Sequence, residues 1–154
     1  MDVRFPARRG EFLKSVKPTA RELGIGFASC SPLGQGFLTG TVTDLKAFDA
    51  DDFRRPLPRF AGDVSGTSKP IVEVVRAIAD RKGVTPGQPA LARSSPTKEE
   101  IVTLPGTKRV AAQEENGAAA DVRLTDSEPA EPQESLPEVV GDRYELYWMA
   151  TIDQ

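Results

Sequence analysis

The sequence predicts an α/β fold in which short strands alternate with helices. A short apolar run at residues 25–28 is followed at once by a loop rich in proline and glycine that ends at Gly40. A second apolar run, at residues 101–104, ends in a turn that carries Lys108 and Arg109. Between them, residues 68–82 have the apolar spacing of an amphipathic helix. This order is typical of an α/β barrel, in which ligands lie at the carboxyl ends of the strands.

The composition excludes several classes of protein. The 154 residues allow one domain with a modest core, but the 38% hydrophobic content and 13 prolines predict that not all of the chain packs into it. A net charge of −3 gives no reason to expect nucleic-acid binding. No apolar run approaches the roughly 18 residues of a membrane span. The chain has one cysteine, Cys30, and no histidine, so we expect a reducing, cytoplasmic setting and no metal site.

The first forty residues divide into a leader, a helical turn and a strand. Residues 1–17 show no strand or helix period, so we expect an irregular leader; its acidic residues argue against an organelle-targeting segment. Pro18 opens a helical turn that Gly24 ends. A buried strand at residues 25–29 follows, and then the glycine loop. Residues 41–60 predict a long surface loop anchored by aromatic residues, namely Phe48, Phe53 and Phe60.

The centre of the chain predicts one good helix and one interrupted helix. The first covers residues 68–82, with Ser68 as N-cap and Gly83 after its end; its core-packing stripe consists of Ile71, Val74, Val75, Ile78 and Ala79. Thr85 and Pro86 then begin a second helix. Pro89 lies only one turn further on, and residues 93–96 offer no apolar face. We therefore expect this second helix to begin but not to continue.

The last third of the chain begins with the strand at residues 101–104, which we expect to be buried. A helix starts at Val110 and runs to Asn116. Thr125 and Glu128 have the spacing of a capping box, but Pro129 and Pro132 interrupt the helix that should follow. Residues 126–138 are therefore predicted to be irregular. The aromatic tail, residues 139–154, would dock on the core.

Both strand-to-loop junctions suit a phosphorylated nucleotide. Backbone N–H groups of the glycine loop would receive a pyrophosphate. Lys108 and Arg109 would pair with a further phosphate. Glu115 and Asn116 would hydrogen-bond a purine edge. The alternative interpretation is two tight turns with solvated surface cations.

Several segments together resemble one known family. They are Arg21 to Phe27, Ser31-Pro32-Leu33-Gly34-Gln35-Gly36-Phe37-Leu38-Thr39-Gly40, Asp51 to Arg55, Pro58-Arg59-Phe60, Ile101 to Arg109, Glu114-Glu115-Asn116 and Gly141 to Tyr144. In order and spacing they resemble the C-terminal part of the aldo-keto reductases, over residues 18–150. The resemblance implies a (β/α)8 TIM barrel that uses NADPH to reduce small aldehydes and ketones. This chain would be an incomplete barrel, supplying about its last two βα units.

The resemblance also implies roles for individual residues. The pyrophosphate-covering loop would be formed by Ser31, Leu33, Gly34, Gly36 and Leu38. The turn at the adenosine 2′-phosphate would comprise Gly106, Thr107 and Lys108, with Arg109 beside it, and the adenine contacts would be Glu115 and Asn116. Two positions depart from the family. Ala112 stands where some branches have glutamine, and Cys30 stands where a tyrosine stacks on the nicotinamide.

The family's catalytic Asp, Tyr, Lys and His come from the first half of the barrel, so we expect this chain to lack them. Because the helices are interrupted as well, we expect the sequence to come from a truncated or decaying gene copy, or from a mispredicted gene model. The resemblance favours an oxidoreductase fragment that binds NADPH at most and is inactive alone. The alternative is a non-catalytic interaction module, NADPH sensor or relic that associates with another barrel half, or with itself, through unpaired strands. A third hypothesis, a minimal enzyme with Cys30 as nucleophile, lacks an evident neighbouring base.

Overall fold

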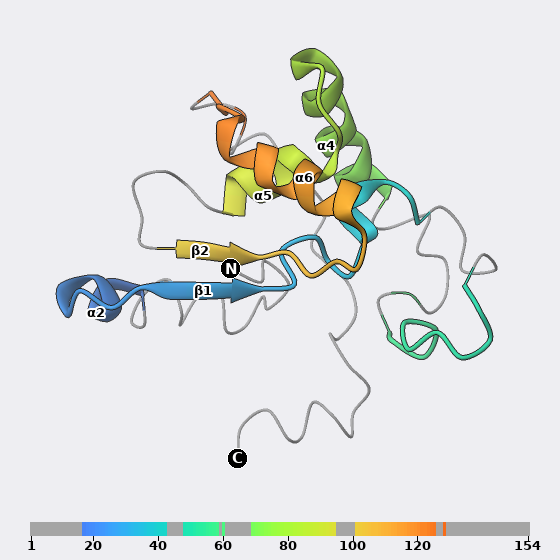
Figure 1. Cartoon of the computed structure of the whole chain (residues 1–154), viewed down its shortest axis with the longest axis horizontal. Coiled ribbons are helices and arrows are strands. Elements are labelled where there is room, and N and C mark those ends of the chain that lie inside the picture. Colours follow the sequence, from blue (N-terminus) through green and yellow to red (C-terminus); the bar gives the residue numbers. More distant parts are fainter. Residues whose placement is uncertain are drawn as a thin grey trace.

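The computed structural model describes residues 17–42, 48–58, 60, 69–94, 101–125 and 128. The elements in chain order (Figure 1) are helix α2 (Lys17–Glu22), strand β1 (Phe27–Cys30), the 3-10 turn η2 (Phe37–Thr39), helices α4 (Lys69–Lys82) and α5 (Gly87–Ser94), strand β2 (Ile101–Leu104), helix α6 (Val110–Ala118) and the 3-10 turn η4 (Ala119–Asp121). Strands and helices alternate, as the α/β prediction requires.

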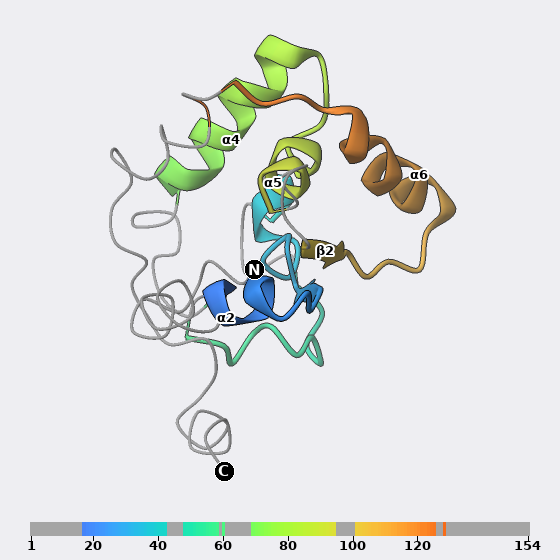
Figure 2. The ribbon, with the colours of Figure 1, turned by 90° about the vertical axis from the view of Figure 1, so that its left-hand side faces the viewer.

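The two strands form a parallel pair whose register joins Phe27 to Ile101 and Cys30 to Leu104. A parallel pair needs a crossover connection, and α4 and α5 lie within it. Helices α4, α5 and α6 lie on the same side of the strands in both views (Figure 1, Figure 2), and α5 contacts β2. The carboxyl ends of both strands therefore meet at one edge, from which the two predicted ligand loops leave.

The first strand begins two residues later than predicted because the end of α2 uses Ile25. Gly24 adopts the left-handed conformation, with φ 65°. The Gly24 N–H donates to Arg21 O (3.2 Å) and the Ile25 N–H to Ala20 O (2.8 Å). This pair of bonds is a Schellman motif, which confirms that Gly24 ends the helix. Ile25 is consequently 53% exposed rather than buried in a strand.

The prediction that residues 101–104 form a buried strand is correct in its bounds and wrong in most of its burial. Ile101 is 8% exposed, whereas Val102 and Leu104 are 63% and 55% exposed. Alternate residues of a strand face opposite sides. The side of β2 that carries Ile101 is covered, and the side that carries Val102 and Leu104 is not.

Helix α4 matches its prediction closely. Val75, Ile78 and Ala79 of the predicted stripe are buried, and Ile71 and Val74 are half-buried. Its end is a second Schellman motif, in which Gly83 (φ 65°) and Val84 donate to carbonyls of the last turn. The predicted N-cap, Ser68, lies outside the described residues.

The prediction that the second helix fails at Pro89 is wrong. Helix α5 runs from Gly87 to Ser94, and residues 87–91 are buried. Pro89 is only its third residue. The first N–H groups of a helix have no intrahelical acceptor, so proline at this position loses no hydrogen bond.

The predicted loop at residues 41–60 is anchored by two of its three phenylalanines. Phe48 and Phe60 are buried with Leu57, and Phe37 and Val42 pack against this cluster. The rings of Phe48 and Phe60 meet edge to face with centroids 5.7 Å apart. Phe53 is 64% exposed, so its predicted role as an anchor is wrong.

The C-terminal part of the described chain follows its predictions. Helix α6 begins at Val110. The capping-box contact is present, because Glu128 Oε2 accepts the Thr125 N–H at 2.7 Å. Among the described residues, no helix is long and apolar enough to cross a membrane. The predictions for residues 1–16, 126–127 and 129–154 lie outside the described residues.

Candidate functional site

The candidate site lies at the shared edge of the two strands. The glycine loop, residues 31–40, leaves the carboxyl end of β1, and residues 105–109 leave the carboxyl end of β2 before α6 begins (Figure 1). The parallel register places both loops at the same end of the pair. This is where ligands bind in α/β proteins with parallel strands.

The glycine loop is a series of tight turns that use most of its own N–H groups. Gly34, Gly36, Phe37, Leu38, Thr39 and Gly40 donate to carbonyls within the loop. The N–H groups of Leu33 and Gln35 donate to no acceptor in the described part of the chain. These two N–H groups are therefore available as donors to a pyrophosphate, whereas those of Gly34, Gly36 and Leu38 are used within the loop.

Backbone strain marks the same loop. Ser31 and Gln35 are not glycines, yet their φ angles are 51° and 60°. Left-handed conformations cost L-residues roughly 1–2 kcal/mol, and they concentrate at functional sites. Gly34 and Gly36 also have positive φ, at 62° and 93°. The loop therefore depends on the surrounding structure to hold its shape.

The amino end of α5 joins the glycine loop to α6. A Cβ atom placed on Gly87 would lie 3.4 Å from Glu115 Oε1, 3.7 Å from Leu33 Cδ2 and 3.8 Å from Thr39 Cγ2. The glycine loop and α6, two segments distant in sequence, thus converge on this glycine of α5. Both segments carry predicted cofactor residues, so Gly87 lies where the two parts of the candidate site meet.

The contacts of Glu115 were not foreseen from the sequence. Its Oε1 accepts the Thr85 hydroxyl at 2.6 Å, and its carbonyl accepts Gln88 Nε2 at 3.1 Å. Gln88 Oε1 in turn accepts the Thr85 N–H at 3.0 Å. Thr85 and Gln88 have the spacing of a capping box, and this local signal could have revealed the hydrogen bond between them. The contacts between α5 and α6 have no such signal.

The second loop presents unpaired positive charge. Gly106, Thr107, Lys108 and Arg109 are exposed. Thr107 Oγ1 accepts the Arg109 N–H at 3.2 Å, and the side chains of Lys108 and Arg109 have no hydrogen bond or ion pair to the described residues. Helix α6 begins at the next residue, Val110, so its unsatisfied N–H groups add positive potential. Two cations at a helix amino end form a suitable anion site.

The remaining predicted residues lie around these loops. Asn116 follows Glu115 on α6, and its half-buried side chain has no hydrogen-bond partner among the described residues. Leu38 lies in η2, which packs against α4 and α5. Cys30 is exposed at the end of β1, and Ala112 is half-buried in α6. No acidic or cysteine cluster suited to a metal ion occurs in the described ranges.

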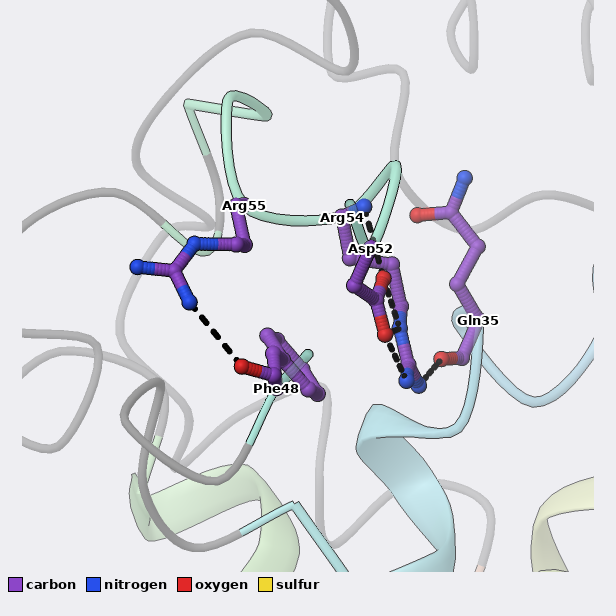
Figure 3. A network of polar contacts seen from close by, with 5 residues as sticks. All are labelled: Gln35, Phe48, Asp52, Arg54 and Arg55. Carbon is purple, nitrogen blue, oxygen red and sulfur yellow. Dashed lines mark hydrogen bonds and ion pairs between the residues drawn. The ribbon is translucent and has the colours of Figure 1, made fainter. Parts of the chain in front are cut away.

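A polar network that the sequence did not predict supports the glycine loop (Figure 3). Arg54 Nη1 donates to the Gln35 carbonyl at 3.1 Å, and Arg54 Nη2 pairs with Asp52 Oδ2 at 2.6 Å. The hydrogen bonds from the side chain and backbone of Arg54 lower the pKa of Asp52 from its ordinary 3.8 to about 2. The same partnership raises the pKa of Arg54. Both groups remain charged at neutral pH.

The chain is similar to proteins of one family. A model of the Aldo/keto reductase family matches residues 11–136. The chain is 38% identical over 127 residues to the aldo-keto reductase str7 of Strobilurus tenacellus, covering 81% of this chain and 38% of that protein. It is 37% identical over 131 residues to the NADP(+) aldo-keto reductase yakc of Schizosaccharomyces pombe, covering 84% of this chain and 38% of that protein. The chain thus spans under two fifths of the length of these relatives.

Proposed function

The chain belongs to the aldo/keto reductase family, and from this premise we propose that it supplies the NADPH-binding C-terminal part of a (β/α)8 barrel. Residues 18–150 would be that part, with residues 1–17 as a leader and 126–138 irregular. The parallel pair with helices on one side is consistent with two βα units of such a barrel. The relative yakc, named for NADP(+), supports the choice of cofactor.

The observation that carries the proposal is the charge of Lys108 and Arg109, whose side chains have no hydrogen bond or ion pair to the described residues. These cations lie at the amino end of α6, at the same sheet edge as the glycine loop. They fit the 2′-phosphate that distinguishes NADPH from NADH. The N–H groups of Leu33 and Gln35, which have no acceptor among the described residues, fit a pyrophosphate. Asn116 and the second carboxylate oxygen of Glu115 are the adenine contacts of this proposal.

Bound NADPH would supply a hydride to the carbonyl carbon of an aldehyde or ketone. The carbonyl oxygen also needs a proton from a donor with a suitable pKa. The chain has no histidine, and Cys30 cannot stack on a nicotinamide as an aromatic ring would. We therefore propose that this chain, in a cytoplasmic setting, binds the cofactor but does not complete the reaction alone.

Fluorescence titration with NADPH and NADH tests the cofactor site. We expect NADPH to bind more tightly than NADH, and Lys108→Ala/Arg109→Ala to remove that preference. Arg123→Ala, which removes an exposed cation beyond the carboxyl end of α6, should keep it, as should Cys30→Ala. Equal affinity for the two dinucleotides, or no NADPH binding, would contradict the proposal. NADPH oxidation with small aldehydes should stay at background.

A second candidate function is association through the bare side of the sheet. The register pairs Ala28 with Val102 and Cys30 with Leu104, and all four side chains are exposed. Parallel strands are normally covered on both faces. On this interpretation the face takes another barrel half or a second copy of the chain. Light scattering after size exclusion should then show an assembly that Val102→Asn/Leu104→Lys disrupts; a monomeric wild type would count against it.

A further inference from the structure

A hydrogen bond from the side chain of Arg54 connects residues 48–58 to the glycine loop. Arg54 Nη1 donates to the Gln35 carbonyl across 19 positions of the sequence (Figure 3). Gln35 is one of the loop's two non-glycine residues with positive φ. The contact therefore reaches the loop at a strained residue, whose conformation persists only where the surrounding structure holds it.

The Arg54 guanidinium is itself held on several sides. Nε lies 2.9 Å from Asp52 Oδ1, and Nη2 lies 2.6 Å from Asp52 Oδ2, so the pair is bidentate. The guanidinium carbon lies 4.1 Å from the centre of the Phe48 ring. The Arg54 side chain is only 24% exposed and that of Asp52 only 16%. Arg54 thus reaches Gln35 from a fixed position.

The peptide group between Gln35 and Gly36 is restrained at both ends. Arg54 holds its carbonyl, and its N–H, which belongs to Gly36, donates to Leu33 O at 3.2 Å. A Cβ atom on Gly36 would lie 3.4 Å from Arg54 Nη1, so the guanidinium packs directly against this backbone. Rotation of this peptide group would break both hydrogen bonds together.

We propose that Arg54 is a positioning residue for NADPH, which keeps the glycine loop in the conformation that leaves the N–H groups of Leu33 and Gln35 available to the cofactor. Because Asp52 and Phe48 hold Arg54, NADPH affinity then depends on how residues 48–58 pack against the loop. The inference rests on the proposed function and extends it to residues that touch no cofactor themselves.

The geometry calls for arginine in particular. The planar guanidinium donates hydrogen bonds to both carboxylate oxygens of Asp52 and to the Gln35 carbonyl, while one of its faces lies on the Phe48 ring. A lysine ammonium is a compact charge that cannot do this from one position. Arg54→Lys therefore keeps the charge and removes the restraint on Gln35, which makes it the informative variant.

The test compares two ligands on the whole 154-residue chain. We expect Arg54→Lys to weaken NADPH binding about tenfold, because the loop must then order itself on binding. Adenosine 2′-monophosphate lacks the pyrophosphate, so its affinity should be unchanged. Arg55→Lys is the matched control, because it makes the same exchange at the neighbouring arginine, and a lysine can keep the single hydrogen bond that Arg55 donates to the Phe48 carbonyl at 2.9 Å; its NADPH affinity should equal that of the wild type.

An equal loss of affinity for both ligands, or an unchanged affinity for NADPH, would contradict the positioning role of Arg54. Amide hydrogen exchange of residues 33–40 in the free protein gives a readout without cofactor. Faster exchange in Arg54→Lys but not in Arg55→Lys supports the restraint, and equal exchange in the two variants refutes it. If the wild type binds neither ligand, the proposed function fails, and exchange alone decides whether Arg54 orders the loop.

Discussion

The hydroxyl of Thr85 donates a 2.6 Å hydrogen bond to Oε1 of Glu115, which lies 30 positions further along the chain. Thr85 precedes α5 and Glu115 lies in α6, so this bond links the start of one helix to a residue proposed to bind adenine. It fixes one carboxylate oxygen, and the other has no hydrogen-bond or ion-pair partner in the part of the chain that the structure describes. The Glu115 side chain therefore has two roles. One carboxylate oxygen joins the start of α5 to α6, and the other is left for the proposed contact with adenine.

Removal of this hydroxyl should destabilise the protein measurably. Thr85→Val keeps the shape and deletes the donor, and we expect a loss of about 1 kcal/mol in the free energy of unfolding. Urea unfolding measures it. Thr103→Val is the control, because Thr103 lies in β2 and has no hydrogen-bond partner among the described residues beyond the strand ladder. An equal loss in both variants would contradict the role given to Thr85.

Two helical glycines should respond differently to alanine. Gly117 of α6 has nothing within 4 Å of the added Cβ, so Gly117→Ala should stabilise by roughly 0.5–1 kcal/mol through helix propensity. At Gly87 the new methyl would meet Glu115 Oε1 at 3.4 Å, and Thr85 holds that oxygen. Gly87→Ala should therefore stabilise less or not at all. Thermal unfolding compares the two, and equal gains would show that the junction at Gly87 has room.

The glycine after α4 should tolerate asparagine better than alanine. Gly83 has φ 65° and an open surrounding, so the cost of a side chain there is conformational rather than steric. Gly83→Ala should cost about 1 kcal/mol, and Gly83→Asn should cost less, because asparagine adopts the left-handed conformation more readily. Urea unfolding of both variants measures the difference. Equal costs would indicate that the Schellman motif at this end is not maintained.

The Asp52–Arg54 pair should make stability fall in acid. The folded-state pKa of Asp52, about 2, lies below its ordinary 3.8. The unfolded state therefore takes up a proton more readily than the folded state. The contribution of Asp52 to the free energy of unfolding is complete above about pH 4 and is lost as the pH falls toward about 2. The difference in unfolding free energy between wild type and Asp52→Asn should shrink across this range. A difference independent of pH would contradict the prediction.

Glu128 should add an acid-sensitive contribution of its own. The Thr125 N–H, and then Lys82 at 3.1 Å, lower its pKa, and Arg81 also faces it at 3.6 Å. Its contribution is likewise lost as the pH falls below the ordinary range for glutamate. Glu128→Gln should therefore flatten the acid side of the stability profile measured by urea unfolding. The changes in unfolding free energy caused by Glu128→Gln and Asp52→Asn should add in the double variant. Strong non-additivity would show that the two ion pairs are energetically coupled, which contradicts the prediction.

Local sequence signals predicted the helix ends and the second strand well. Gly24 and Gly83 end their helices because glycine alone adopts the left-handed conformation without cost, and this requirement involves only neighbouring residues. The Pro89 prediction failed because its cost depends on where the helix begins. The start of α5 is set partly by Gln88 and by its contact with α6, which no local pattern reveals.

Local propensity and motif order predicted the alternation of strands and helices, the amphipathic stripe of α4, the family and most of the proposed cofactor residues. Gln35 joins these residues because of its N–H group in the folded loop. Which faces of the strands are covered follows from the packing of distant segments, and the sequence patterns did not predict it. The tertiary structure buries Ile101 and exposes Val102 and Leu104. It also joins Arg54 to Gln35 and Thr85 to Glu115. Such contacts depend on the packing of segments distant in the chain, so no local pattern encodes them.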